Sequence, residues 1–212
     1  ACHIGHIAEG SGSRPRKTGK MPAAGAGIPW LRHASPIAML RCTMPDFLNL
    51  PARAGFRPAA LFRPASLVLV MAGGSAEAPI LARNLAAGGF RGRLMAVGGT
   101  PDGFEAFPSI AALPAAPDLA VLCLPPDALE PAMVALVEKG CHAGVVPGPA
   151  PSLAGLQQRT GMRAVGQGSF GIAVPAIGLN ATLSHIPPAT GRLALVTQSS
   201  AIARAVLDWA AA

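Results

Sequence analysis

A buried strand followed at once by a glycine turn and a helix constrains this chain more than any other feature. The run Leu67–Met71 is wholly apolar, which predicts a strand that is buried on both faces of a sheet. Ala72-Gly73-Gly74-Ser75 follows directly, and residues 77–87 (EAPILARNLAA) form a helical run. Strand, glycine turn and helix together open a doubly wound α/β domain. Glycines let the backbone approach a ligand closely, and the free N–H groups of a helix N-terminus attract phosphate, so this unit predicts an anion-binding turn.

The same alternation of strand and helix continues along the chain. Further strands are expected at residues 93–97, 119–124, 144–146 and 162–165, and helices at 128–139 and 152–160, with Asp127 and Ser152 as their N-caps. A short helical turn is expected at 108–113, and a loop at 166–172. Five apolar strands separated by helices imply a parallel sheet with right-handed crossovers.

The candidate site residues lie where the predicted strands end. In an open parallel sheet the ligand binds beyond the carboxyl ends of the strands. Clusters of glycine and proline fall at those ends, and the loops between strands and helices also need these residue types for their turns, so the clustering alone leaves a purely structural role equally open. The candidate ligand-binding residues are Ala72, Gly73, Gly74, Ser75, Val97, Gly98, Gly99, Leu124, Pro125, Pro126, Pro147, Gly148, Gly168 and Ser169.

The first 60 residues differ in composition from the rest of the chain. They are rich in proline, glycine, serine and basic residues, among them Arg14, Arg16, Lys17 and Lys20, and carry no persistent helix or strand period. We expect residues 1–60 to be a disordered or low-complexity segment outside the fold. The net charge of +7 leaves nucleic acid or an anionic membrane surface as alternatives to a solvated tail, and nucleic acid is the less favoured reading.

Membrane, metal and redox classes are disfavoured by the sequence. No apolar run reaches the roughly 18–20 residues that a membrane span needs. The four cysteines, Cys2, Cys42, Cys123 and Cys141, show no CxxC spacing, and no metal site is expected. Cys123 is expected to be a reduced core residue, which fits a cytoplasmic location.

The last 26 residues predict the beginning of another unit. After a linker at Pro187-Pro188, residues 192–197 (RLALVT) are expected to form a buried strand and residues 201–211 a helix. One strand and one helix cannot form a core alone. We therefore expect residues 61–186 to form the main domain and residues 187–212 to be the truncated first βα unit of a second, flavodoxin-like one, which makes the chain a fragment or one that needs a partner.

The motifs of common enzyme classes are absent from the sequence. The turn after the first strand does not match G-x-G-x-x-G, and no acidic residue follows Val97 to hold a ribose, so NAD(P) is disfavoured. His142 and His185 have no acidic neighbour in sequence, and no general acid–base pair is found. The residues themselves favour a domain that binds a ligand without catalysing a reaction.

Several stretches together resemble one family. They are Leu61–Val70, Asn84–Arg93, Pro117–Val121 with Pro125, Gly178–Thr182 and Gly191–Ser199. As a series these are similar to the CoA-binding domain of NDP-forming acyl-CoA synthetases, relatives of the succinyl-CoA synthetase α subunit. The resemblance covers residues 60–212 and is closest to bacterial forms fused to an N-acetyltransferase-like domain.

This resemblance implies a Rossmann-like fold with CoA lying across the strand ends. It places Gly73, Gly74 and Ser75 at the CoA phosphates and Pro125 beside the adenine or pantetheine. The implied reaction joins an acid to CoA with ATP, giving acyl-CoA, ADP and phosphate through a phosphohistidine. That histidine and the ATP-grasp part, with its ATP and Mg, are expected beyond residue 212, so no catalytic residue is assigned here. The implied partners are CoA or acyl-CoA and an ATP-grasp domain or subunit, in a homo- or hetero-oligomer.

The family's second strand usually ends in a Val-Asn-Pro-Lys-like turn whose lysine can reach a CoA phosphate. Here the turn is Val97-Gly98-Gly99-Thr100, so that cation is missing. The alternative function is a degenerate or regulatory Rossmann-like module that binds another nucleotide or none.

Overall fold

We describe residues 56–211 in a computed structural model of the chain, and these residues lie within one compact unit. The basic segment, most of the predicted low-complexity region, and residues 2 and 42 with their cysteines lie outside the described part.

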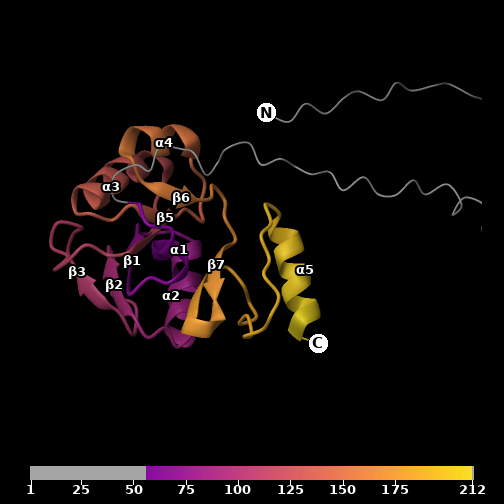
Figure 1. Cartoon of the computed structure of the whole chain (residues 1–212). Helices are drawn as coiled ribbons and strands as arrows, with labels where there is room; N and C mark the ends of the chain where they lie inside the picture. Colours follow the sequence, from indigo (N-terminus) through magenta and orange to yellow (C-terminus); the bar gives the residue numbers. More distant parts are fainter. Residues whose placement is uncertain (1–55, 212) are drawn as a thin grey trace, which may run out of the picture. The chain divides into compact units, whose positions relative to one another are not determined.

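A six-stranded parallel sheet forms the centre of the fold and confirms the predicted doubly wound α/β class (Figure 1). The strand order is β3-β2-β1-β4-β5-β6. Neighbouring strands pair in parallel, with Leu69 opposite Ala96 on one side and Val121 on the other. The strands are β1 (Ser66–Met71), β2 (Arg93–Val97), β3 (Glu105–Phe107), β4 (Leu119–Cys123), β5 (Ala143–Val145) and β6 (Arg163–Val165).

Helices and a small hairpin cover the two faces of this sheet. The covering helices are α1 (Ala59–Phe62), α2 (Glu77–Ala87), α3 (Pro126–Glu138) and α4 (Leu153–Thr160), whereas α5 (Ser200–Ala211) adds no residue to either core. The antiparallel hairpin consists of β7 (Gly171–Val174) and β8 (Leu179–Thr182), joined through the 3₁₀ turn η3 (Pro175–Ile177). Figure 1 shows α3 and α4 together on one side of the sheet, with α2 and β7 away from them.

Alternation along the central strands explains the two layers. Val68 and Val70 belong to the core that includes the apolar residues of α3 and α4. Leu67 and Leu69 belong to the other core, with α2 and the hairpin. Because successive strand residues point to opposite faces, a strand that is apolar at every position must be covered on both sides.

Of the two predicted helix N-caps, one is confirmed and the other is wrong. Ser152 is the N-cap of α4, as predicted, and its hydroxyl oxygen accepts a 3.2 Å hydrogen bond from the Gly155 N–H. Asp127 is not the N-cap of α3, because the helix begins at Pro126, two residues earlier than predicted, and Pro125 occupies the cap position. Asp127 lies instead in the first turn, where its charge complements the helix dipole.

Two segments differ from their predictions, and a third agrees. Residues 108–113 form the expected turn, in which the N–H groups of Ala112 and Leu113 donate to carbonyl oxygens three residues earlier. The predicted loop at 166–172 contains the start of the β7–β8 hairpin. Residues 192–197 form no strand and are exposed, with Val196 at 99% exposure. A strand needs a neighbouring strand for its backbone hydrogen bonds, and none lies beside this segment within residues 56–211. The predicted division at residue 187 remains a prediction.

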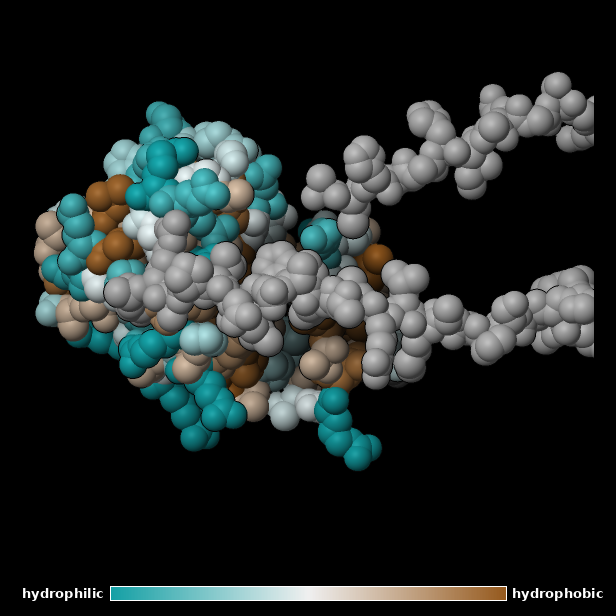
Figure 2. Space-filling model, turned by 45° about the horizontal axis from the view of Figure 1, so that its top comes forward, coloured by the Kyte–Doolittle hydropathy of each residue, from teal (hydrophilic) through white to brown (hydrophobic). Residues whose placement is uncertain are grey.

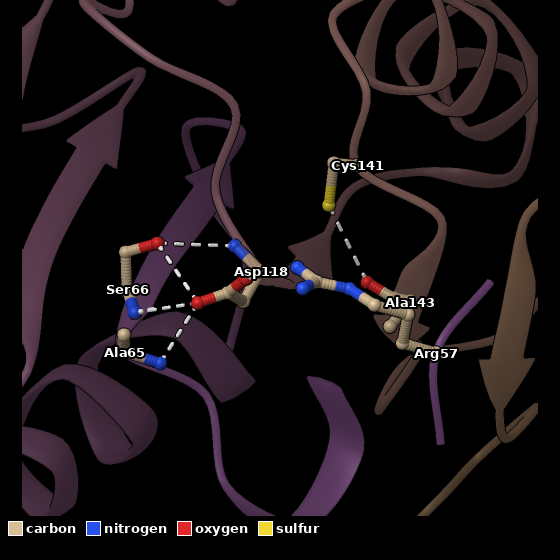
Figure 3. Close-up of polar contacts among 6 residues, drawn as sticks. All are labelled: Arg57, Ala65, Ser66, Asp118, Cys141 and Ala143. Atoms are coloured by element: carbon tan, nitrogen blue, oxygen red, sulfur yellow. Dashed lines mark hydrogen bonds and ion pairs between the residues drawn. The ribbon is translucent and has the colours of Figure 1, made fainter. Parts of the chain in front are cut away.

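Asp118 joins the start of β1 to the start of β4 at the amino edge of the sheet (Figure 3). Its Oδ2 accepts hydrogen bonds from the N–H groups of Ala65 at 2.8 Å and Ser66 at 3.2 Å. The Ser66 Oγ in turn accepts from the Asp118 N–H at 3.1 Å, and Arg57 forms a 3.1 Å ion pair with Oδ1. One carboxylate thus links the starts of β1 and β4 at this edge.

The surface of the described part mixes hydrophilic and hydrophobic residues, and the hydrophobic ones form separate patches in the view of Figure 2. Among residues 56–211, the helices are too short or too polar for any of them to span a bilayer.

Candidate functional site

The sequence-predicted site residues gather at one edge of the sheet. They follow β1, β2, β4, β5 and β6, and all five strands run parallel, so their carboxyl ends lie at the same edge. We call the loops at residues 72–75, 97–100, 124–126, 146–149 and 166–169 the carboxyl edge. The order of the strands reverses between β1 and β4, which is where doubly wound sheets bind their ligands.

The turn after β1 leaves its backbone open. Gly73 and Gly74 are exposed, and a Cβ atom built on either one meets no atom within 4 Å. Gly74 also has a φ of +84°, a conformation that residues with a side chain rarely adopt. The Ala72 N–H donates to the Cys123 carbonyl oxygen at 3.1 Å, which fixes the start of this turn against the end of β4. The turn is thus held at its base and free of side chains at its tip.

The N-terminus of α2, directly after this turn, carries two polar side chains. The Ser75 hydroxyl donates a 2.9 Å hydrogen bond to Oε2 of Glu77 and accepts one of 3.3 Å from the Ala78 N–H. Ser75 therefore satisfies one of the free N–H groups at the helix start. Oε1 of Glu77 lies 3.9 Å from the position that a Cβ atom on Gly148 would take, so the loops after β1 and β5 meet at this carboxylate.

The loops after β5 and β6 are tied to each other by their backbones. The Gly168 N–H donates to the Gly148 carbonyl oxygen at 2.9 Å, and the Ser169 N–H to the Val146 carbonyl oxygen at 3.3 Å. Pro147 and Gly148 are buried, whereas Gly168 is exposed and a Cβ on it would meet no atom within 4 Å. Of the four candidate residues in these two loops, Gly168 is exposed, Ser169 is half-buried and the other two are buried.

The loop after β2 packs against its own chain. Gly98 has a φ of +85°, and a Cβ on it would lie 2.0 Å from the Met71 carbonyl oxygen. A Cβ on Gly99 would lie 2.7 Å from the Met71 sulfur, and the Val97 side chain is buried in the core. The close contact with Met71 of β1 accounts for glycine at positions 98 and 99, and burial in the core accounts for Val97. None of these three candidates needs a ligand to explain it.

The loop after β4 has a mixed character. Leu124 is half-buried and packs against the core, while Pro125 and Pro126 are exposed at the start of α3. Two rigid apolar rings are thus exposed at the end of β4, the strand that pairs with β1.

Charge is scarce at the carboxyl edge. Its five loops contain no lysine or arginine, and Glu77 stands in the first turn of the helix after the first of them. Burial, and secondly the Glu77 carboxylate, raise the pKa of the Cys123 thiol to about 12, so this cysteine stays protonated at neutral pH. The guanidinium carbon of Arg204 in α5 lies 5.7 Å from the centre of the Phe170 ring, next to the loop after β6. Sequence reasoning considered the loops alone and therefore missed Glu77 and Arg204.

The described residues hold no group of three or more histidine, cysteine and acidic side chains arranged to bind a metal ion. His185 lies 3.4 Å from Asp208 of α5, and both side chains are more than half exposed. His142 lines a small pocket with Asp118 at the amino edge, on the other side of the sheet from the glycine turns. Neither histidine lies in the five loops of the carboxyl edge.

A parallel sheet with an open glycine turn at its carboxyl edge is the architecture of Rossmann-like domains. No family model matches the chain. It is 30% identical over 119 residues to the ADP-forming acetate–CoA ligase I of Archaeoglobus fulgidus, an alignment that includes 50% of this chain and 17% of that protein. The chain thus spans about one sixth of this curated relative.

Solved structures also relate the chain to acetyl-CoA synthetases. The chain matches dinucleotide-forming acetyl-coenzyme A synthetase 1 of Ca. Korarchaeum cryptofilum, in complex with phosphate and ADP, with a TM-score of 0.62 and 25% identity over 71% of this chain and 36% of that one. The apo form of that enzyme matches with a TM-score of 0.63. A Pyrococcus horikoshii protein shares the fold with a TM-score of 0.61 at 20% identity, over 71% of this chain and 38% of that one. The chain is related to the ADP-forming acyl-CoA synthetases, which confirms the resemblance seen in its sequence.

Proposed function

We propose that the carboxyl edge binds CoA and that the chain is the CoA-binding portion of an ADP-forming acyl-CoA synthetase. The observation that carries this proposal is the open turn at Gly73 and Gly74, placed at the N-terminus of α2 beside the β1–β4 switch point in a chain related to such synthetases. In the proposed reaction an acid, CoA and ATP give an acyl-CoA, ADP and phosphate.

Main-chain groups supply most of the proposed contacts. The N–H groups at the start of α2 point toward the turn, and the helix dipole favours a phosphate there. The bare tips at Gly73, Gly74 and Gly168 let a pyrophosphate approach the backbone, and Pro125 and Pro126 offer an apolar surface to the adenine or pantetheine. Because no cation stands in the five loops, we expect an affinity below that of sites with charged phosphate contacts.

Further parts are needed for the complete reaction. The carboxyl edge contains no histidine, and the buried Cys123 thiol at the end of β4 is not a nucleophile at neutral pH. We propose that an ATP-grasp domain or subunit supplies ATP and Mg, and that the phosphohistidine lies outside the described residues. A cytoplasmic location and assembly into an oligomer belong to the same proposal.

Calorimetric titration of the full chain with CoA, and separately with NAD, tests the proposal. We expect saturable heat with CoA at a Kd of roughly 10 μM to 1 mM and none with NAD. Absence of heat with CoA at millimolar concentration would contradict it. Heat with NAD would then indicate a different nucleotide-binding module, and silence with both ligands would indicate a regulatory module without a nucleotide.

A further inference from the structure

The carboxylate of Glu77 lies where loops of the carboxyl edge come together. Glu77 is half-buried and begins α2, two residues after the turn at 72–75. Its Oε1 lies 3.9 Å from the position that a Cβ atom on Gly148 would take, in the loop after β5. Burial, and secondly the charge of Glu77, raise the pKa of the Cys123 thiol to about 12, so the field of this carboxylate also reaches the end of β4. Its negative charge therefore acts on the space beside the open turn.

A hydrogen bond fixes this carboxylate in place, and no cation pairs with it within residues 56–211. Its Oε2 accepts from the Ser75 hydroxyl at 2.9 Å. The ion pairs of the described part use other acidic residues, which are Asp118, Glu105, Glu130 and Asp208. The five loops of the carboxyl edge contain no lysine or arginine that could offset the charge. A ligand at the open turn therefore meets a full negative charge.

A carboxylate at an anion-binding helix end discriminates among phosphates by their charge. The helix dipole supplies about half a positive charge at the N-terminus of α2, which is less than the charge of Glu77. An internal phosphate, bonded to the rest of its molecule through two oxygens, carries one negative charge. A terminal phosphate carries nearly two at pH 8, because its second pKa is near 6. Glu77 therefore repels a terminal phosphate about twice as strongly as an internal one at the same place.

We propose that Glu77 is a specificity-determining residue that keeps terminal phosphates away from the turn at Gly73 and Gly74. This inference rests on the proposed CoA function and adds which phosphates the site admits. The pyrophosphate of CoA is internal, whereas the outer phosphates of ADP and ATP, and inorganic phosphate, are terminal. In a synthetase that handles all of these, Glu77 leaves the CoA site free of nucleotide. The 3′-phosphate of CoA, which is terminal, then lies away from the start of α2.

Dephospho-CoA and ADP form a matched pair of probes for this proposal. Both carry adenosine and two phosphates, and the second phosphate is internal in dephospho-CoA and terminal in ADP. Calorimetry at pH 8 measures the Kd of each probe for the full chain and for Glu77→Gln, whose amide oxygen can still accept from Ser75. Titration of ADP against bound dephospho-CoA assigns both probes to the same site. The ratio of Kd values between the two proteins cancels the contribution of the pantetheine arm, so the response to charge remains.

Removal of the Glu77 charge is expected to help ADP more than dephospho-CoA. A unit charge about 4 Å from another changes the Kd roughly fivefold in water, and a second ligand charge adds a further factor of similar size. We therefore expect Glu77→Gln to lower the Kd of dephospho-CoA about fivefold and that of ADP at least about fifteenfold. The preference for dephospho-CoA over ADP then falls at least about threefold.

Asp127→Asn is the matched control. Asp127 also lies in the first turn of a helix behind the carboxyl edge, but it is exposed and belongs to α3, which packs on the opposite face of the sheet from α2. We expect this variant to change both Kd values by less than about twofold. Equal improvement of both probes by Glu77→Gln, or the same change of preference in Asp127→Asn, would overturn the role of Glu77 while CoA binding stands. Absence of heat with CoA and dephospho-CoA in all three proteins would instead contradict the proposed function, and the role of Glu77 with it.

Discussion

The Ser75 hydroxyl donates a 2.9 Å hydrogen bond to the Glu77 carboxylate at the N-terminus of α2. The same oxygen accepts from the Ala78 N–H, so the chain itself uses part of the helix start that would otherwise bind an anion. The carboxylate also reaches across to Gly148. A phosphate bound at the open turn therefore approaches a fixed negative charge as well as a favourable helix dipole.

Replacing Glu77 by glutamine is expected to strengthen CoA binding. Two like charges about 4 Å apart interact by roughly 1 kcal/mol in water, which corresponds to about a fivefold lower Kd when one is removed. Calorimetry with CoA measures the change. Glu138→Gln, at the end of α3, removes the same charge far from the carboxyl edge and is expected to have little effect. Weaker binding by Glu77→Gln would show that the carboxylate contacts the ligand favourably.

A lysine at position 100 is expected to add the missing phosphate contact. Thr100 is exposed directly after the turn that packs on Met71, so a longer side chain meets no obstacle in the core. A charge-assisted hydrogen bond contributes about 1.5–3 kcal/mol, and we expect at least a tenfold lower Kd for CoA from Thr100→Lys. Lysine in place of the exposed Ala115, which precedes β4 at the amino edge, controls for net charge. Equal gains from both variants would point to a general charge effect.

We predict that alanine at position 73 lowers the affinity for CoA, whereas alanine at position 98 lowers the free energy of unfolding. Gly73→Ala places a methyl group in open space without a strained φ, so the free energy of unfolding is expected to change by less than about 0.5 kcal/mol while CoA binding weakens. Gly98→Ala adds a methyl group 2.0 Å from the Met71 carbonyl oxygen at a φ of +85°, and is expected to destabilise the fold by roughly 1–3 kcal/mol from the dihedral alone.

Urea unfolding and CoA titration of the same two proteins separate these effects. A stable Gly73→Ala protein that binds CoA with unchanged affinity would remove the turn after β1 from the proposed site.

Asp118→Asn is expected to weaken the fold at its amino edge and leave ligand binding intact. Both backbone N–H groups bond to Oδ2 and Arg57 pairs with Oδ1, so an asparagine whose amide oxygen takes the place of Oδ2 accepts from both N–H groups only as a neutral acceptor and loses the ion pair. We expect a loss of about 1–3 kcal/mol in the free energy of unfolding, measured in urea. Arg57→Ala removes only the exposed partner and is expected to cost less than about 1 kcal/mol. Equal losses from the two variants would show that the ion pair, rather than the backbone contacts, carries the stabilisation.

The sequence was sufficient for the main sheet because its central strands are apolar at every position. Leu67–Val70 and Leu119–Cys123 can be placed only between two covered faces. The short strand β3 escaped prediction because Glu105 and Ala106 are exposed and its pairing with β2 includes a surface ion pair between Arg93 and Glu105. The β7–β8 hairpin escaped it because glycine and proline interrupt its residues, which is typical of a loop.

The candidate site was predictable in position and only partly in detail. Parallel pairing brings the strand ends to one edge, which follows from the fold class alone. The separate roles of Gly73 and Gly98 could not be inferred from sequence, because they depend on how closely Met71 approaches each glycine. The direction of the Glu77 side chain likewise depends on the hydroxyl of Ser75.

The two buried cysteines predict how stability and thiol reactivity depend on pH. Burial raises the pKa of Cys123 and of Cys141 to about 12, above the ordinary value near 9 that both regain on unfolding. A raised folded-state pKa stabilises the fold fully below pH 9, and this contribution is lost as the pH rises from 9 to 12. In a Cys2→Ser, Cys42→Ser background, we expect no reaction with a disulfide reagent at pH 8 in buffer and two reactive thiols in denaturant. We also expect the Tm to fall between pH 9 and 11, and to fall less when Cys123→Ala and Cys141→Ala are added. Fast labelling of the native protein at pH 8 would contradict the burial of both thiols.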